Sequence, residues 1–414
     1  MGRGGFPPGN LRTFRSFKNP NFRLYFFGMS GMMAAQNILL IGRSLLAYRL
    51  TRSAAFLGGV AVAYTAPIFF VSLFGGVIAD RVQKKYVILV GLAGSALVVL
   101  GLALSLTLGY LSAERTGSWW ILIVAVALLG AISGLIMPAR QSILPEIVGK
   151  EGLLNAVSLN SVGTNALRLI VPVATGFIID AIGFAAIYYI MTGLYLVAVV
   201  LIAFLPRTTS ITIRVQGALT DIIEGFQYLR RETILIIILL FVIVIFLLSF
   251  PYMMMLPIFT EDILNVGATG LGVLMSVSGV GAIASSLTLA SLPNRKRGAM
   301  LLASSLILGV ALVGFSFSSS WPLSLGIIII VGLGQSGRMA LANTLLQYYS
   351  DDEHRGRVMS IFNLDIGLSA ITTFAAGLMA ETVGVQWAIG GFATVLIFLT
   401  ILTLVFVPRL RRLD

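Results

Sequence analysis

The chain has 414 residues, of which 58% are hydrophobic and 11% charged, with a formal net charge of +12. A soluble domain carries about a quarter charged residues, so a chain this apolar needs lipid as part of its solvent. Its apolar runs do not alternate, which excludes an outer-membrane barrel. With no cysteine and one histidine, the sequence excludes disulfides, thiolate chemistry and a multi-histidine metal site, and we expect no cofactor.

Twelve apolar segments are each long enough to cross a bilayer as a helix. In chain order they occupy residues 22–49, 54–79, 86–110, 118–139, 153–180, 184–205, 234–258, 268–292, 298–317, 321–348, 357–382 and 386–407. They predict an all-α membrane protein. The basic stretch before them, rich in Gly and Pro, predicts a short tail and not a cleaved signal peptide.

The basic residues that connect the segments fall mainly on one side of the predicted membrane. With the N-terminus inside, the outer connections collect only Arg49, Arg52 and Arg115. Cytoplasmic connections are enriched in Lys and Arg, so both termini are expected in the cytoplasm. This orientation explains the positive net charge without a nucleic-acid partner.

The connection between the second and third segments is short and strongly charged. It carries Asp80, Arg81, Lys84 and Lys85, and Gly76 precedes it by one helical turn. Glycine permits close approach of another helix, and an acid at a helix C-terminus is unfavourable unless a partner compensates it. We expect an arginine or a helix N-terminus of the other half to be that partner, which would latch the two halves on the cytoplasmic side.

The longest connection, residues 206–233, separates six segments from six. Its apolar residues at 219, 222, 223, 226 and 229 follow helical spacing, which predicts an amphipathic helix on the membrane interface. Stretches 152–163 and 356–367 are similar, as in duplicated transporter folds. The predicted units are a tail at 1–21, a six-helix bundle at 22–205, a linker at 206–233, a six-helix bundle at 234–408 and a tail at 409–414.

The segment "GGVIADRVQKK" at 75–85 resembles the signature loop of the major facilitator superfamily, Gly-x-x-x-Asp-Arg-x-Gly-Arg-Arg. The matching residues are Gly76, Asp80, Arg81, Lys84 and Lys85. Stretches 19–28, 137–148, 155–176 and 355–362 are similar to the branch that holds the enterobactin exporter and macrolide efflux proteins. The resemblance covers nearly the whole chain and implies a twelve-helix bacterial inner-membrane protein that exports its substrate.

Two positions depart from that branch. Exporters of the branch commonly carry Gly-Pro in the fifth helix, where this chain has Val171 and Pro172. Pro172 still removes a backbone donor and can bend the helix. In the first helix, Ala35 and Gln36 replace a frequent Gly-Asp pair, so an acidic group is missing.

Three arginines and one acid fall inside the predicted helices. Each arginine costs roughly 2.5–3.5 kcal/mol at the bilayer centre on insertion scales, so burial against protein or water is expected. Arg338 is assigned to a central cavity, whereas a cavity role and snorkelling to the outer surface both stay open for Arg43. Arg168 is assigned a structural or gating role. Asp365 is a candidate for proton coupling, for pairing with Arg338, or for pairing with the charged connection between the second and third helices. Asp180 and Glu381, near outer helix ends, are interpreted as solvated caps.

The resemblance implies that helices 1, 4, 7 and 10 line a central cavity. The predicted substrate-binding residues are Gln36, Asn37, Arg43, Tyr252, Gln335 and Arg338. The predicted gating residues are Gly76, Asp80, Arg81, Lys84, Lys85, Arg140, Arg168, Pro172, Arg355, Arg357 and Asp365. A net positive cavity with aromatic and thioether neighbours suits an anionic amphiphile, such as a siderophore or an anionic lipid.

The sequence therefore predicts a monomeric secondary transporter that exports an amphiphilic small molecule by alternating access. Its partners would be the substrate, the lipid bilayer and, as a candidate coupling ion, the proton. The chain has no paired acids, histidine cluster or ATP-binding loop, so an enzyme or an ATP-driven pump is not expected. Two alternatives stay open: a gradient-independent lipid flippase or scramblase, and a non-transporting receptor or scaffold of the same fold.

Overall fold

The computed structural model describes residues 12–206, 227–230, 232–292, 295–351 and 354–413. The side chains of residues 12–13, 73–81, 150 and 366 are not part of this description. Most of the predicted linker, including its amphipathic stretch up to Phe226, lies outside the described residues.

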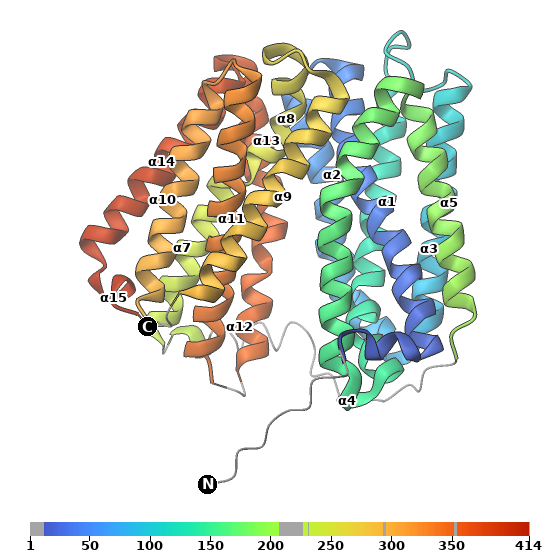
Figure 1. Cartoon of the computed structure of the whole chain (residues 1–414). Helices are drawn as coiled ribbons and strands as arrows, with labels where there is room; N and C mark the ends of the chain where they lie inside the picture. Colours follow the sequence, from blue (N-terminus) through green and yellow to red (C-terminus); the bar gives the residue numbers. More distant parts are fainter. Residues whose placement is uncertain (1–11, 207–226, 231, 293–294, 352–353, 414) are drawn as a thin grey trace.

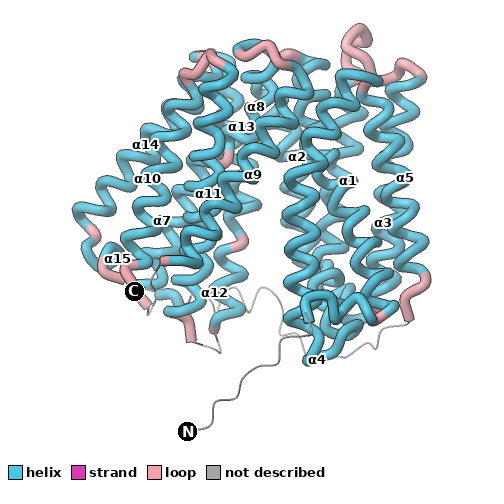
Figure 2. Tube along the Cα trace, viewed as in Figure 1, coloured by secondary structure: helices cyan, strands magenta, loops and turns pink. Residues whose placement is uncertain are grey.

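The described chain is built of helices and holds no strand, which confirms the predicted all-α class (Figure 2). Twelve helices of this part are long and apolar enough to cross a membrane, as predicted. The elements of the first half are η1 (Arg12–Lys18), α1 (Pro20–Thr51), α2 (Ala54–Arg81), α3 (Lys84–Thr107), α4 (Trp119–Ile182) and α5 (Phe184–Ala203). Those of the second half are α7 (Thr233–Ser249), α8 (Pro251–Ile258), η2 (Phe259–Ile263), α9 (Gly267–Ser291), α10 (Arg297–Ser316), α11 (Trp321–Tyr349), α12 (Arg355–Phe362), α13 (Leu364–Val383), α14 (Val385–Phe406) and α15 (Pro408–Arg411).

Local sequence signals explain where several helices begin and bend. The Asn19 side chain accepts a hydrogen bond from the Asn21 amide at 2.9 Å, and Pro20 fixes the first turn of α1. α4 holds two membrane spans, Trp119–Gly149 and Glu151–Ile182. They meet at Gly149, whose φ of 68° is strained for any residue with a side chain. Two predicted segments are thus one helix broken by a glycine.

The helices form two bundles that spread apart toward one end of the molecule (Figure 1). α1–α5 pack on one another as the N-terminal bundle, and α7–α15 as the C-terminal bundle. Both η1 and α15 lie at the end where the bundles diverge. We call this end the terminal side and the opposite end the distal side.

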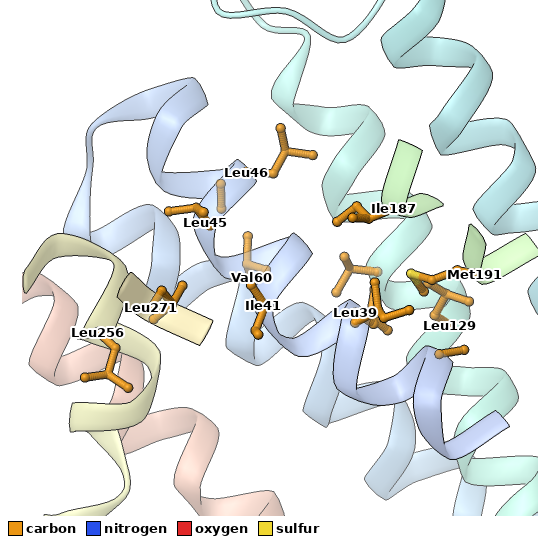
Figure 3. Packing of buried hydrophobic residues seen from close by; sticks show 14 of the residues in the cluster. Leu39, Ile41, Leu45, Leu46, Val60, Leu129, Ile187, Met191, Leu256 and Leu271 are labelled. Carbon is orange, nitrogen blue, oxygen red and sulfur yellow. The ribbon is translucent and has the colours of Figure 1, made fainter. Parts of the chain in front are cut away.

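A continuous apolar core crosses from one bundle to the other. Within the N-terminal bundle, Figure 3 shows Leu39 of α1 close to Met191 of α5. Leu256 of α8 and Leu271 of α9 belong to the same cluster of buried side chains, although they come from the C-terminal bundle. A second cluster, which includes Val242, is confined to the C-terminal bundle. The first cluster therefore contributes apolar cohesion between the bundles.

Candidate functional site

A cavity of about 650 Å³ lies between the two bundles. Its walls come from α1 and α4 on one side and from α7, α8, α9 and α11 on the other. It is lined by Met33, Gln36, Asn37, Leu40, Thr164, Arg168, Pro172, Phe246, Tyr252, Met253, Leu256, Leu274, Met275, Ser278, Gly279, Ala282, Ile328, Gly332, Gln335, Ser336, Arg338, Met339, Ala340 and Asn343. These lining residues include two arginines and no acid.

Five of the six predicted substrate-binding residues line this cavity: Gln36, Asn37, Tyr252, Gln335 and Arg338. The Tyr252 hydroxyl donates to Gln335 Oε1 over 3.2 Å. The Asn37 amide donates to the Met33 carbonyl one turn earlier, over 2.8 Å. These bonds orient a wall of carboxamide and hydroxyl groups, from α1 on one bundle and from α8 and α11 on the other.

Arg338 borders the cavity, but its guanidinium is held inside the C-terminal bundle. The residue is 1% exposed, and Nη1 lies 3.5 Å from the Val242 carbonyl oxygen of α7. The Phe246 ring is 5.4 Å from the guanidinium carbon, and Asp365 of α13 attracts the charge electrostatically. Asp365 itself is 3% exposed. The predicted pairing of these two residues stays a prediction; Arg338 is buried at the cavity wall, and Asp365 is not among the residues that line the cavity.

Arg43 lies outside the set of residues that line the cavity. It is 6% exposed, and its guanidinium stacks on the Tyr64 ring at 3.8 Å within the N-terminal bundle. Its Nε and Nη1 atoms have no hydrogen-bond partner among the described residues. A cation–π contact stabilises such a buried charge, and it leaves the ring and guanidinium packed as part of the bundle core.

Arg168 is the exposed cation of the cavity. Thr164, Arg168 and Pro172 are spaced by four residues, so they form one stripe on α4 that faces the cavity. No hydrogen bond, ion pair or ring contact joins Arg168 to another residue of the described chain. The geometry therefore places on the cavity wall a residue to which the sequence assigned a gating role.

Ion pairs join the two bundles on the distal side. Arg49 donates to Glu261 Oε1 from Nη2 at 2.7 Å and from Nε at 3.2 Å. Arg52 Nη1 lies 3.0 Å from Asp262 Oδ1, and the Tyr48 hydroxyl donates to Asp262 Oδ2. The donors belong to the end of α1 and the turn after it, whereas both acids belong to η2, so every one of these bonds ties one bundle to the other.

Asp180 and Glu381 cap helices of the opposite bundle and are not merely solvated helix ends. Asp180, at the end of α4, accepts from the Thr269 amide at 2.7 Å and the Thr269 hydroxyl at 2.8 Å, in the first turn of α9. Glu381, near the end of α13, accepts from the Ala55 amide at 3.2 Å and from the Ser53 hydroxyl, at the start of α2. Free amides and the helix dipole favour a carboxylate at a helix N-terminus.

A glycine one turn before each capping acid lets two backbones touch. A Cβ atom at Gly176 would lie 2.2 Å from the Ala268 carbonyl oxygen, and one at Gly377 would lie 2.5 Å from that of Ala54. Gly176 and Gly377 are 201 residues apart (377 − 176), as are Asp180 and Glu381 (381 − 180). Gly-x-x-x-acid thus occurs in both halves of the chain, among the inter-bundle contacts of the distal side, which we call the distal seam. Sequence reasoning missed this network, although that repeated spacing was a readable signal.

On the terminal side, Lys84 and Lys85 make contacts within the N-terminal bundle. Lys84 forms an ion pair with Glu146 of α4. Lys85 donates to the backbone carbonyls of Ala203, at 2.7 Å, and Leu205, where it satisfies acceptors at the end of α5. In this state, both lysines therefore tie α3 to its own bundle.

The other predicted gating residues are spread over both bundles. Arg140 Nη1 donates to the sulfur of Met33, a cavity residue, at 3.6 Å. Arg355 Nε donates to the Gln347 carbonyl at 3.1 Å, and Arg357 lies in the first turn of α12. The side chains of Gly76, Asp80 and Arg81, at the end of α2, lie outside the described residues.

Twelve spans, two bundles and a cavity between them define a membrane transporter of the major facilitator type. The chain matches the family model MFS_3, described as transmembrane secretion effector, over residues 13–414, and it belongs to this family of the major facilitator superfamily. Family and fold are those of transporters, which are not enzymes. Across the described residues, no group of three or more His, Cys, Asp and Glu could hold a metal ion.

Relatives and solved structures of similar fold cover nearly the whole chain. The staphyloferrin A transporter of Staphylococcus aureus is 27% identical over 90% of this chain and 94% of its own. The multidrug efflux pump Tap of Mycolicibacterium fortuitum is 25% identical over 86% of this chain and 88% of its own. A bacterial homologue of the human lysosomal transporter Spinster, solved in an inward-facing, unoccupied conformation, has a TM-score of 0.75 at 11% identity, covering 98% of this chain and 100% of that one.

Proposed function

We propose that this protein is a monomeric secondary active exporter that moves an amphiphilic small molecule by alternating access. Its terminal side faces the cytoplasm of a bacterium, and its distal side faces outward across the inner membrane. The observation that carries the proposal is the position of the cavity, which lies between the bundles next to a distal seam made of inter-bundle contacts. Rocking of the bundles about a central site is the mechanism that such an arrangement supports.

The distal contacts support a resting state that is closed to the outside. They are of three kinds: ion pairs at η2, carboxylate caps on α2 and α9, and glycine contacts one turn below the caps. All of them join one bundle to the other, so all must break for the cavity to open outward. Substrate taken up from the cytoplasm would offset their loss only if it binds the outward-open state better.

The lining of the cavity supports an amphiphilic cargo. Carboxamides and hydroxyls form part of the wall, while Met253, Met275, Met339, Phe246 and Leu256 form an apolar part. Unbranched thioether side chains adapt to varied apolar shapes. Relatives named as a staphyloferrin A transporter and a multidrug efflux pump agree with a siderophore-like or drug-like molecule, and a lipid-like one fits the same wall.

For coupling, Asp365 is the acid that we assign to proton exchange. It is buried against the charge of Arg338, so gain or loss of its proton changes how strongly Arg338 is held within the C-terminal bundle. Exchange of a proton for cargo would then act through the cavity wall formed by α11. Asp365→Asn is therefore expected to abolish gradient-driven accumulation and to leave cargo binding intact.

The test is transport in proteoliposomes that contain the purified protein and a fluorescent amphiphile. An imposed proton gradient, acid on the distal side, should drive net movement of the amphiphile toward that side, and a protonophore should stop it. Movement of lipid without any gradient would instead identify a scramblase. Binding without movement would indicate a receptor of the same fold.

A further inference from the structure

The membrane-spanning part of the chain holds an arginine that has no partner among the described residues. Arg168 lies within the span Glu151–Ile182, is exposed, and lines the cavity. It has no hydrogen bond, ion pair or ring contact with the described residues. By contrast, Arg338 is held by α7 and Asp365, and Arg43 by Tyr64. Intramembrane charges are costly and mark substrate paths, so a partner for Arg168 is expected from outside the protein.

The surroundings of Arg168 favour an anion as that partner. The residues that line the cavity include no aspartate or glutamate. The polar groups that line it with Arg168 include the carboxamides of Gln36, Asn37, Gln335 and Asn343. Carboxamide N–H groups and a guanidinium together form a set of donors for carboxylate, sulfonate or phosphate oxygens, and a guanidinium can bind such a group in a bidentate manner.

The position of Arg168 along α4 links this charge to the distal seam. Pro172 lies one turn further toward the distal side, about 6 Å along the helix axis. A Cβ atom at Gly272 of α9 would lie 2.2 Å from the Pro172 carbonyl oxygen, so the two helices touch there. An anion at Arg168 would therefore sit where the cavity meets the contact between the two bundles.

We infer that Arg168 recognises the anionic head of the exported amphiphile, and that the cargo class is a monoanionic amphiphile bearing a carboxylate, sulfonate or phosphate. The inference rests on the proposed function and narrows its substrate. The apolar part of the same cavity, which includes Met253, Met275 and Phe246, takes the apolar tail. Arg168 is thus a specificity-determining residue, in addition to its place next to the seam.

The experiment compares three probes that differ only in the head group: pyrene butanoate, pyrene butanol and pyrene butyl-trimethylammonium. Binding to the protein in nanodiscs is followed by fluorescence anisotropy, and transport is followed in proteoliposomes. The wild-type protein should bind the carboxylate about 10- to 100-fold more tightly than the alcohol, which is the range typical of a charge-assisted hydrogen bond, and the ammonium least. Arg168→Gln should abolish that preference and leave the affinity for the alcohol unchanged.

Arg168→Lys retains the charge and should recover part of the preference. Arg230→Gln removes one exposed positive charge outside the membrane spans and serves as the matched control. An unchanged carboxylate-to-alcohol ratio in Arg168→Gln overturns the inference. An equal loss of affinity for both probes also overturns it, because it indicates a structural role. If the wild-type protein transports the alcohol and carboxylate equally, the inference fails while the proposed function stands. If it transports none of the probes, the proposed function fails as well.

Discussion

The ion pair between Arg49 and Glu261 offers the sharpest perturbation of the distal seam. Arg49→Gln removes a charge-assisted hydrogen bond at 2.7 Å and the weaker attraction to Asp180 at 3.6 Å. Such a bond contributes about 1.5–3 kcal/mol. The Arg49 side chain is 31% exposed and that of Glu261 is 11% exposed, so solvent screening reduces the expected loss to about 1–2 kcal/mol. That loss lowers the ratio of distal-closed to distal-open molecules about 5- to 30-fold.

The assay uses the absence of cysteine from the chain. A single cysteine replaces Ser278, a cavity residue of α9, and a membrane-impermeant maleimide is added from the distal side. When opening and closing are faster than labelling, the rate follows the open population, so Arg49→Gln should accelerate labelling about 5- to 30-fold. Glu261→Gln should accelerate it similarly, and the double variant should exceed either single variant only slightly, because both remove the same bond.

The matched control is Lys84→Gln, which removes an ion pair within the N-terminal bundle. It should leave the distal labelling rate unchanged. The reasoning is refuted if Arg49→Gln labels no faster than the wild-type protein, or if the two substitutions at Arg49 and Glu261 prove fully additive.

Three further outcomes follow from the same contacts. Gly377→Leu places a Cβ atom 2.5 Å from the Ala54 carbonyl oxygen, so it should separate α2 from α13. The unfolding free energy should fall by about 1–3 kcal/mol, measured by thermal unfolding in detergent. Unchanged stability would contradict the close contact between these two helices. Asp180→Ala and Glu381→Ala each remove a cap, and the two acids share no hydrogen-bond partner, so their effects on distal labelling should add. Strong coupling between the two substitutions would argue against separate caps. Lys85→Met leaves the carbonyl oxygens at the end of α5 without their donor, so it should destabilise the N-terminal bundle by about 1–3 kcal/mol without changing distal labelling; a changed labelling rate would show that Lys85 acts between the bundles.

The helices could be predicted from sequence because the formation of each one depends mainly on its own composition. An apolar run of about 20 residues must satisfy its backbone internally in lipid, so it becomes a helix whatever surrounds it. Gly149 illustrates the limit of this reasoning: its φ of 68° breaks α4 without ending it, and only the geometry shows two spans in one element.

The site was less predictable because it depends on which side chains meet across the bundles. Gln36, Asn37, Tyr252 and Gln335 could be placed on the cavity because they belong to helices that the family resemblance assigns to its walls. The direction in which an arginine side chain points could not be predicted, because its guanidinium can reach several neighbours. Arg43 turns to Tyr64 within its bundle, although a cavity role was one of its two predicted fates.

The distal acids Asp180 and Glu381 also have a role that the sequence alone did not predict. Asp180 and Glu381 look like ordinary polar helix ends in sequence, because their partners Thr269 and Ala55 belong to the opposite bundle. The spacing of Gly-x-x-x-acid, repeated after 201 residues, becomes meaningful once both copies are seen to make the same contact (377 − 176 and 381 − 180).

The most direct test of alternating access is a reversible lock across the distal seam. Asp180 and Thr269 are in side-chain contact across the bundles at 2.8 Å, and the chain has no native cysteine to interfere. The double variant Asp180→Cys, Thr269→Cys should lose transport when oxidised to a disulfide and regain it on reduction. A control pair within one bundle, Ser318→Cys with Ser324→Cys, whose hydroxyl oxygens lie 2.9 Å apart, should transport equally in both states. Undiminished transport by the oxidised Asp180→Cys, Thr269→Cys protein would contradict the account, because the bundles would then not need to separate on the distal side.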